Sequence, residues 1–294
     1  MMPCCYDGLT AKLIERAGFE ATFMSGFGVS AVHGFPDVQL LSFGEMAQAA
    51  TYVCNALDRI PCIGDGDTGY GNATNVKRTV KAYAQAGMAG IMIEDQVSPK
   101  RCGHTAGKAV VSREEAYARI RAAVDARNEG GFDIVILART DARHTHSPEE
   151  AIERCREFVR LGADITFFEA PRDIQEMRNY CTTVPGPKMA NMVENGLTPI
   201  LKPKVLQELG YKLVIYPLTL LSSSIKTMET ALSLLQSQDE ESTESVSNVE
   251  MTGNEATTMP LRSLLSDFEH VKDVVGFTQY YEEENRYKRT NARK

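Results

Sequence analysis

Two carboxylates placed two residues apart give the strongest chemical signal in this sequence. Asp65 and Asp67 lie in the segment GDGDTGYG, directly after a short apolar run, and Glu94 ends the next such run. Side chains two apart in an extended chain point to the same side, so Asp65 and Asp67 are expected to face one site, where like charges require a compensating cation. Carboxylate oxygens suit Mg²⁺ or Mn²⁺, which favours a metal site. A Gly/Asp turn with solvated carboxylates is the alternative.

A basic segment around one thiol is the second signal. The segment SPKRCGHTAGK (98–108) contains glycines and no apolar anchor, which is typical of a surface loop that can move. Its side chains Lys100, Arg101 and His104 surround Cys102 in the sequence. Such neighbours lower the pKa of a thiol and favour the thiolate, so Cys102 is expected to act as a nucleophile or as a general acid–base. A basic loop without any chemistry is the alternative.

An arginine and a turn of small residues complete the set of candidate groups. Arg139, in ARTDAR, is typical of a bidentate clamp for a carboxylate or a phosphonate. Pairing of Arg139 with Glu169 or Asp141 is the alternative, and both can hold at once. Ser25 and Gly26, in MSGFG, offer backbone N–H groups to an oxyanion, although a plain turn explains them equally well.

Eight short apolar runs, separated by amphipathic stretches, must position these residues. Near-continuous apolar strands are what a parallel sheet buried on both faces requires, and their alternation with helices predicts an α/β protein with a (β/α)8 TIM barrel. A doubly wound open sheet is the alternative, but no GxGxxG opens a helix after the first strand. Because a barrel's site lies at the carboxyl ends of its strands, the polar side chains there should converge on one centre. The runs are 1–5, 21–26, 61–67, 90–95, 134–140, 165–170, 188–193 and 212–217.

The composition excludes several classes of protein. The 294 residues include 39 acidic and 32 basic side chains, a net charge of −7, so we expect no nucleic-acid partner, which would need a basic face. No apolar run reaches the roughly 18 residues of a membrane span, so we expect no membrane partner. The seven cysteines are irregularly spaced without a CxxC pair, which favours a reducing compartment. As the chain stands, without a visible targeting segment, we expect a cytoplasmic protein; a longer form with a transit peptide would direct it to a plastid or mitochondrion.

The composition changes after residue 235. Residues 236–259 contain six acids, no Lys or Arg and little apolar content, which predicts a disordered linker or mobile loop. From residue 260 onward, apolar side chains at a helical spacing predict a helix that needs a partner, either its own barrel or a neighbouring subunit. The predicted domains are therefore a barrel (1–235), an acidic linker (236–259) and a helical arm (260–294).

Taken together, these motifs resemble the isocitrate lyase and phosphoenolpyruvate mutase superfamily, over essentially the whole chain. The combination of KRCGH with a preceding IEDQ strand is highly specific. The resemblance implies a Mg²⁺-dependent barrel enzyme that acts on small α-oxygenated carboxylates. The segments that carry it are YDGLTAKLIERAGFEATFMSGFGVSA, FPD (35–37), GDGDTGYGN, IEDQVSPKRCGH, ARTDAR, FFEAP (167–171), ANMVENGLTP and IYPLTLL.

The resemblance also assigns roles to residues of this sequence. Members that break carbon–carbon bonds use the loop cysteine as the acid that protonates the departing carbanion, which implies this role for Cys102. The metal shell, acting mostly through water, would be Asp65, Asp67 and Glu94 with Asp37 nearby. The pocket for the substrate's carboxylate and oxygen would be Ser25, Gly26 and Phe27, with Arg139 as the carboxylate clamp and Glu169, Asn191 and Thr219 lining the rest. The gating loop would be Lys100, Arg101, Cys102, Gly103 and His104.

The branch within the superfamily stays open at this point. The KRCGH loop departs from the Asn-containing loop of true phosphoenolpyruvate mutases, which disfavours that activity. Cleavage of a 2-alkylmalate, methylisocitrate or oxaloacetate type of substrate is the favoured hypothesis, because the loop cysteine has a clear role there. Carboxyvinyl-carboxyphosphonate phosphorylmutase activity is the first alternative, since the YGN, ARTDAR, ANMVE and IYPL segments are very near that branch. A catalytically idle barrel scaffold is the second alternative.

Two family features concern the ends of the chain. Members usually carry a helix before the first strand, whereas this chain starts within that strand, so a barrel floor without its helical plug is expected. The family also tends to form tetramers through exchanged C-terminal helices. Residues 260–282 are therefore expected to make such contacts in a homo-oligomer, with residues 236–259 as the crossing arm.

Overall fold

The computed structural model describes residues 1–103, 107–241 and 261–288. The chain forms two compact units, Met1–Leu220 and Leu221–Lys294. The division thus lies about one helix earlier than the boundary at residue 235 that the composition indicated. Among the described residues, no helix has the length and apolar character that crossing a membrane requires.

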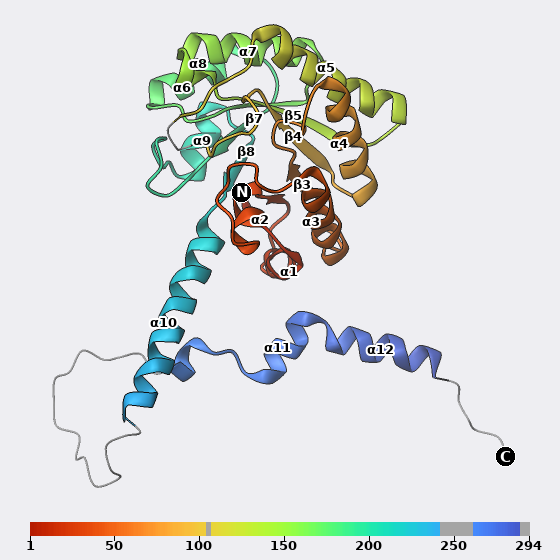
Figure 1. Ribbon diagram of the computed structural model, residues 1–294, viewed down its shortest axis with the longest axis vertical. Helices are drawn as coiled ribbons and strands as arrows, with labels where there is room; N and C mark the ends of the chain where they lie inside the picture. The colour runs from red at the N-terminus through yellow and green to blue at the C-terminus, as the bar shows by residue number, and fades with distance from the viewer. Residues whose placement is uncertain (104–106, 242–260, 289–294) are drawn as a thin grey trace. The chain divides into compact units, whose positions relative to one another are not determined.

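The first unit is a closed barrel of eight parallel strands (Figure 1). Each strand pairs with the next in chain order, and β1 closes the barrel by pairing with β8. The predicted (β/α)8 barrel is confirmed, and the open doubly wound sheet is excluded because the sheet has no free edge. The strands are β1 (Met2–Cys5), β2 (Thr22–Met24), β3 (Cys62–Asp65), β4 (Gly90–Glu94), β5 (Val135–Thr140), β6 (Ile165–Phe168), β7 (Lys188–Asn191) and β8 (Leu213–Tyr216).

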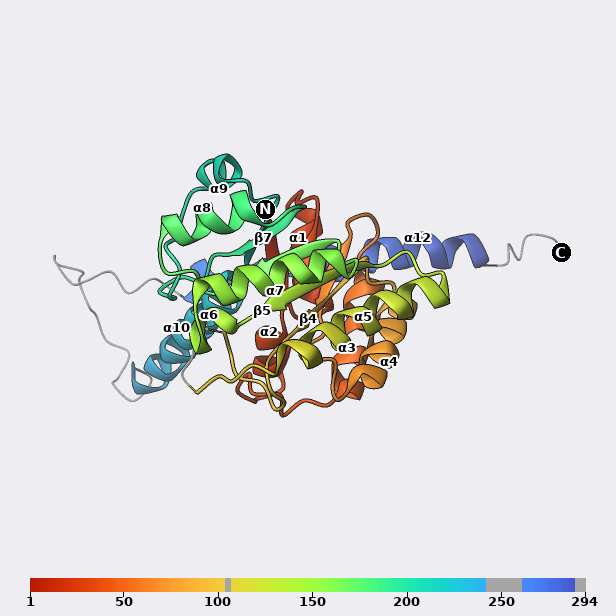
Figure 2. The same ribbon diagram turned by 90° about the horizontal axis from the view of Figure 1, so that it is seen from above.

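Helices surround the strands, and their ends are set by local sequence. Asn72 caps α4 by accepting hydrogen bonds from the backbone N–H groups of Thr74 and Asn75, and Gly87 ends that helix at a left-handed φ of 98°. The neighbouring helices α3, α4, α5 and α7 pack against one another around the strands (Figure 2). The helices of this unit are α1 (Gly8–Arg16), α2 (Gly26–Val32), α3 (Phe43–Ala56), α4 (Ala73–Ala86), α5 (Arg113–Gly130), α6 (Ala142–Thr145), α7 (Pro148–Arg160), α8 (Ile174–Thr183) and α9 (Pro203–Leu209).

Apolar side chains alternate between the inside of the barrel and the helical shell. Outward-facing residues such as Ala190 and Val214 pack in a cluster under α7, α8 and α9. Inward-facing residues from the strands form a separate cluster along the barrel axis. Since both faces are buried, the strands read as continuous apolar runs in the sequence. The inner cluster is Met2, Cys4, Phe23, Met92, Leu137, Phe167, Met189 and Ile215, with Ile63 packed against it.

The second unit is helical. Helix α10 spans Thr219–Glu241, so it continues six residues into the segment expected to be a linker; the rest of that segment lies outside the described residues. The helix expected after residue 260 is present as a short 3₁₀ turn (Leu261–Leu264) and two helices, α11 (Phe268–Val275) and α12 (Phe277–Tyr287). Gly276, at a left-handed φ of 99°, separates α11 from α12.

Candidate active site

A ring of polar side chains follows directly from the alternation along the strands. On six of the strands, the residue two positions beyond an inward-facing apolar side chain is polar. Each therefore points inward too, one layer higher, at the carboxyl end of the barrel. The ring consists of Ser25, Asp65, Glu94, Arg139, Glu169 and Asn191, all of which the sequence analysis had selected.

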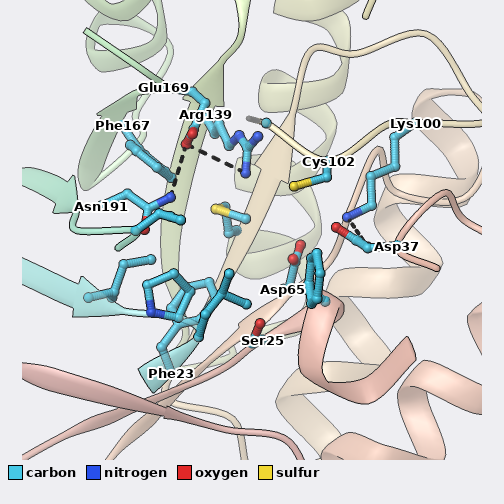
Figure 3. A pocket seen from close by; sticks show the side chains of 17 residues that line it. Phe23, Ser25, Asp37, Asp65, Lys100, Cys102, Arg139, Phe167, Glu169 and Asn191 are labelled. Atoms are coloured by element: carbon cyan, nitrogen blue, oxygen red, sulfur yellow. Dashed lines mark hydrogen bonds and ion pairs between the residues drawn. The ribbon is translucent and has the colours of Figure 1, made fainter. Parts of the chain in front are cut away.

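Five residues of this ring, all except Glu94, line a cavity of about 230 Å³ (Figure 3). Its polar lining comes from the ring and from two loops, which contribute Asp37, Lys100, Cys102 and Gly103. Its apolar lining is called the apolar wall below; apart from Phe27, it was not predicted from the sequence, although the inward alternation of the strands would have indicated most of it. The apolar wall consists of Phe23, Phe27, Met92, Phe167, Val193, Ile215, Pro217 and Leu218.

One side of the cavity gathers three aspartates around a single ammonium group. Lys100 Nζ lies 2.6 Å from Asp37 Oδ1 and 2.9 Å from Asp67 Oδ1. Asp65 accepts hydrogen bonds from the backbone N–H of Asp67 at 3.0 Å and from that of Gly26 at 3.3 Å. Gly26 is required here because a Cβ atom would lie 2.7 Å from Asp65 Oδ2. The turn thus holds the carboxylates together, and Asp67 itself adopts a left-handed φ of 49°, the kind of strain that collects at functional sites.

Burial and crowding shift the titration of this cluster. Burial raises the pKa of Asp67 to about 6, because the attraction of Lys100 only partly offsets desolvation and the repulsion of Asp65. Burial also raises the pKa of Glu94 well above its usual range, against the attraction of Arg139 and Lys100. Burial alone would lower the pKa of Lys100, but the surrounding aspartates raise it well above its usual value. Negative charge is therefore in surplus at this side of the cavity.

The same residues fit a hydrated divalent cation. In the described part of the chain, no three His, Cys, Asp or Glu side chains lie close enough to hold a metal ion directly. Both carboxylate oxygens of Glu94 are buried without a hydrogen-bond donor among the described residues, and their ionic contact is with Arg139 Nε at 3.3 Å. Water molecules carried by a cation would supply donors to such oxygens. Asp37, Asp65, Asp67 and Glu94 therefore suit an ion held largely through its water.

The other side of the cavity is built on Arg139. Asp141 accepts two hydrogen bonds from it, from Nε at 2.8 Å and from Nη2 at 3.1 Å, while Glu169 Oε2 is 3.8 Å from Nη1. The Asn191 amide donates to Glu169 at 3.5 Å, and its Oδ1 is buried without a donor among the described residues. The pairing interpretation of Arg139 is therefore confirmed, whereas its role as a clamp for a substrate carboxylate stays a prediction that would fall to Nη1, 3.8 Å from Glu169.

The loop between β4 and α5 is closed at its base and packs on this arginine. Val97 N–H donates to Ala109 O at 2.8 Å, and the Gln96 side chain exchanges two hydrogen bonds with the backbone of Arg101, each 2.9 Å long. At Gly103, a Cβ atom would lie 2.5 Å from Arg139 Nη2, so the backbone itself touches the guanidinium. Cys102 lines the cavity, and Figure 3 shows its sulfur atom between the Asp65 and Arg139 sides.

Two predicted site residues lie outside the cavity, and a third cannot be compared. Arg101 is exposed and its Nε lies beside Gly107, where a Cβ atom would be 3.4 Å away, so it is outside the cavity. Thr219 is also exposed and donates a hydrogen bond to Glu194, because β8 ends at Tyr216 and α10 begins at Thr219. The prediction that Thr219 lines the pocket is therefore wrong. His104 lies outside the described residues.

The structure removes part of the reason to expect that basic neighbours favour the Cys102 thiolate. Lys100 is engaged by two aspartates and Arg101 points away, so neither directs an unpaired positive charge at Cys102. Cys102 lines the cavity, where a thiol can act as a proton donor or as a nucleophile.

Two residues near the loop were missed as site residues. Gln39 accepts hydrogen bonds from Ser98 Oγ at 2.7 Å and from Lys100 N–H at 3.1 Å, and nothing in its own sequence context indicates this. Lys108, the last residue of the basic segment, is buried and binds Asp141 at 3.0 Å. Its burial could not be read from a segment that looks solvated throughout.

Comparisons with known proteins find similar sequences and similar structures. The family model described as phosphoenolpyruvate phosphomutase matches residues 1–235. The chain is 42% identical over 286 residues to 2,3-dimethylmalate lyase of Eubacterium barkeri, covering 97% of this chain and 92% of that protein. It is 43% identical over 240 residues to the chloroplastic carboxyvinyl-carboxyphosphonate phosphorylmutase of Arabidopsis thaliana, covering 80% and 70%.

One further relative and one solved structure are also similar to this chain. The 2-methylisocitrate lyase of Aeropyrum pernix is 44% identical over 230 residues, covering 78% of this chain and 73% of that protein. Among solved structures, oxaloacetate acetylhydrolase in complex with the inhibitor 3,3-difluorooxalacetate superposes with a TM-score of 0.86 at 32% identity, covering 97% of this chain and 90% of that one.

Cys102 should be the thiol that reacts first with a small alkylating agent. The other two partly exposed thiols, Cys54 and Cys181, both have a pKa raised to about 11, mainly by burial, and neither lines the cavity. Peptide mass spectrometry after brief iodoacetamide treatment near pH 8 should show Cys102 modified at least about tenfold faster than either. Equal rates at the three thiols would contradict the described placement of Cys102.

Proposed function

Because this chain belongs to the phosphoenolpyruvate phosphomutase family, within the isocitrate lyase and phosphoenolpyruvate mutase superfamily, we propose that it is a Mg²⁺-dependent lyase that cleaves a carbon–carbon bond of a 2-alkylmalate. The observation that carries the proposal is the position of Cys102, whose thiol lies in the cavity between the carboxylate cluster and Arg139. A phosphoryl transfer has no obvious use for a proton donor there, whereas a departing carbanion requires one.

The lining of the cavity supports the substrate class. Its two cationic side chains, Lys100 and Arg139, are already in contact with protein carboxylates. A third substrate carboxylate would find no further cation among the described lining residues. The apolar wall instead offers a surface for an alkyl group, as on a dicarboxylate with methyl substituents. The similarity to 2,3-dimethylmalate lyase along almost the whole chain points the same way.

The residues of this chain divide the reaction between the two sides of the cavity. Arg139 Nη1 and Asn191 would bind and orient a substrate carboxylate. The 2-hydroxyl group loses its proton to the carboxylate cluster, and a carbonyl forms at C2 as the C2–C3 bond breaks. The electron pair passes to C3, which takes a proton from the Cys102 thiol, so that a keto acid and a carboxylic acid are released. A Mg²⁺ ion held by Asp37, Asp65, Asp67 and Glu94 would oppose the negative charge on the α-oxygenated half.

Phosphonomutase activity is the second candidate. The 43% identity to carboxyvinyl-carboxyphosphonate phosphorylmutase supports it, and the Arg139 clamp can bind a phosphonate as well as a carboxylate. Turnover of a phosphonate-bearing enolpyruvate, without turnover of any malate, would favour this candidate over the lyase. A catalytically idle scaffold would turn over neither.

A substrate panel tests the lyase directly. With Mg²⁺ present, 2,3-dimethylmalate and other 2-alkylmalates should release a keto acid with a higher kcat/KM than methylisocitrate or oxaloacetate, because only the alkylmalates match the apolar wall without adding a carboxylate. Cys102→Ser should lower kcat by a factor of roughly 10² to 10⁴, the usual size of a general-acid contribution. Cys54→Ser is the matched control, since Cys54 lies outside the cavity. A Cys102→Ser variant with the wild-type rate would refute the assigned role.

Mg²⁺ binding should depend on pH through Asp67. The pKa of Asp67 is raised to about 6, so its carboxyl takes up a proton as the pH falls through that value, and a proton competes with a cation. Calorimetry should therefore show Mg²⁺ affinity falling about tenfold per pH unit below about pH 6 and levelling off above it. In Asp67→Asn the affinity should be weaker and should fall less steeply below about pH 6, with the remaining pH dependence due to Glu94. A wild-type affinity that is the same at both ends of this range would speak against a cation at this cluster.

We also propose that the chain forms a homo-oligomer through its helical unit. Apolar side chains on α10 recur at a spacing of three and four residues and are 45–61% exposed, which is a stripe that a second helix would cover. Light scattering should show a mass of at least a dimer, and a tetramer is the expected state. Paired Met228→Glu and Leu232→Glu substitutions should reduce that mass, and a monomeric wild type would disprove the proposal. The stripe consists of Ile225, Met228, Leu232 and Leu235.

A further inference from the structure

The buried ion pair of Lys108 and Asp141 lies behind the site, and we propose that both are positioning residues that set the Cys102–Gly103 backbone against Arg139. Their side chains are 1% and 0% exposed, and Lys108 Nζ is 3.0 Å from Asp141 Oδ1. This inference rests on the proposed lyase for its effect on turnover, but its geometric content can be measured without any turnover.

Asp141 determines which nitrogen of Arg139 is available. Its two carboxylate oxygens accept from Nε and Nη2, so the guanidinium plane is fixed and Nη1 is left toward the cavity. Burial alone would raise the pKa of Asp141, but Arg139 and Lys108 hold it well below the usual range, so the carboxylate is charged.

Lys108 connects this carboxylate to the loop. Besides its contact with Asp141, its ammonium group donates a short hydrogen bond to the backbone carbonyl of Gly103. Gly103 follows Cys102 directly and has no room for a side chain between its backbone and Arg139 Nη2. One ammonium group thus ties the residue next to the thiol to the carboxylate that orients the arginine.

The pair is anchored to the rigid part of the barrel. The backbone N–H of Asp141 donates to Asp95 Oδ1 at 2.9 Å, and Asp95 Oδ2 is held by Arg154 Nη1, also at 2.9 Å. Arg154, on α7, additionally donates to the carbonyl of Val111 at 3.0 Å, at the point where the loop returns to the barrel. The loop is therefore fixed both at its return and at Gly103, with Asp141 as the shared reference.

Stability alone gives little reason for this arrangement. A fully buried ion pair costs most of its attraction in desolvation, so an apolar pair of similar volume would stabilise the fold as well or better. What an apolar pair cannot do is fix one carbonyl and one guanidinium in a defined geometry. The role of the pair is therefore to fix where Arg139 Nη1 and the Cys102 thiol lie.

The test compares Lys108→Met with Lys188→Met in the full-length chain. Lys188 is a matched control because it is also buried and also donates to a glycine carbonyl, that of Gly186 at 2.6 Å, but at the start of β7, away from the cavity. Three quantities are measured for each variant: the Tm, the kcat and KM on a substrate from the panel, and the rate of Cys102 alkylation by iodoacetamide.

Lys108→Met should lower kcat about 100-fold with KM changed by less than about threefold, since the proton donor is misplaced while most binding contacts remain. It should also raise the rate of Cys102 alkylation about threefold or more, because the Gly103 carbonyl is released. Lys108→Arg, which keeps the charge, should have a kcat at least about tenfold higher than that of Lys108→Met. Lys188→Met should lower the Tm without changing kcat or alkylation.

Several results would overturn the positioning role. These are an unchanged kcat in Lys108→Met, a fall in kcat without a change in alkylation, or an equal effect of Lys188→Met on both. If Lys108→Met does not fold, Asp141→Asn tests the same contact and should raise the alkylation rate in the same way; an unchanged rate in that variant refutes the role. If the wild-type chain turns over no substrate, the lyase proposal fails, whereas the alkylation rates still decide the positioning role.

Discussion

Charge that is buried and must be compensated is the constraint on which this site depends. Six carboxylates lie buried in or directly behind the cavity, against three buried cations. Closing eight short strands into a barrel forces this concentration, since the carboxyl end of every strand delivers an inward side chain to the same small volume. The carboxylates are Asp37, Asp65, Asp67, Glu94, Asp141 and Glu169, and the cations are Lys100, Lys108 and Arg139.

The compensation is unequal on the two sides. Around Arg139, hydrogen-bonded pairing with Asp141 produces a charged and ordered arrangement, in which Nη1 lies 3.8 Å from Glu169. Around Lys100, one ammonium group cannot balance its neighbours, and burial together with repulsion between the carboxylates raises the pKa of Asp67 and of Glu94. A cation that brings its own water would offset this surplus, and in the proposed mechanism it would act opposite Arg139, with Cys102 between the two sides.

Much of the fold and the strand-borne part of the site could be predicted from the sequence, because the same pattern encodes both. A strand buried on two faces is continuously apolar, so a polar residue at its end, such as Glu94 or Asn191, marks both the end of the strand and the mouth of the barrel. The loops follow no such rule. Lys100 and Arg101 are adjacent and alike in type, yet one reaches the aspartates and the other lies on the surface, because the backbone of the loop sets their directions.

The contacts that the sequence did not indicate are long-range and made by loop residues. Lys108 looks solvated within a basic segment, and only the fold places it over Asp141. Gln39 contacts the same loop from a turn roughly 60 residues earlier. Its backbone has a left-handed φ of 60°, which no sequence pattern indicates. The prediction for Thr219 was wrong for a similar reason, because the register at the end of β8 decides which of the residues after Tyr216 face inward.

The apolar wall has a consequence for how such a protein can diverge. Phe167, whose ring centroid lies 5.3 Å from Arg139 Cζ, touches the charge network, whereas Val193, Ile215 and Leu218 have purely apolar side chains; the residues of the network hold one another in place, and Gly103 tolerates no added atom. Substitutions in the wall change volume and little else, within the tolerance of a well-packed apolar surface. In the proposed lyase, substitutions at Val193, Ile215 or Leu218 would change which alkyl group fits the cavity without changing the residues that carry the reaction. Substrate range and mechanism would then evolve on separate parts of the same cavity.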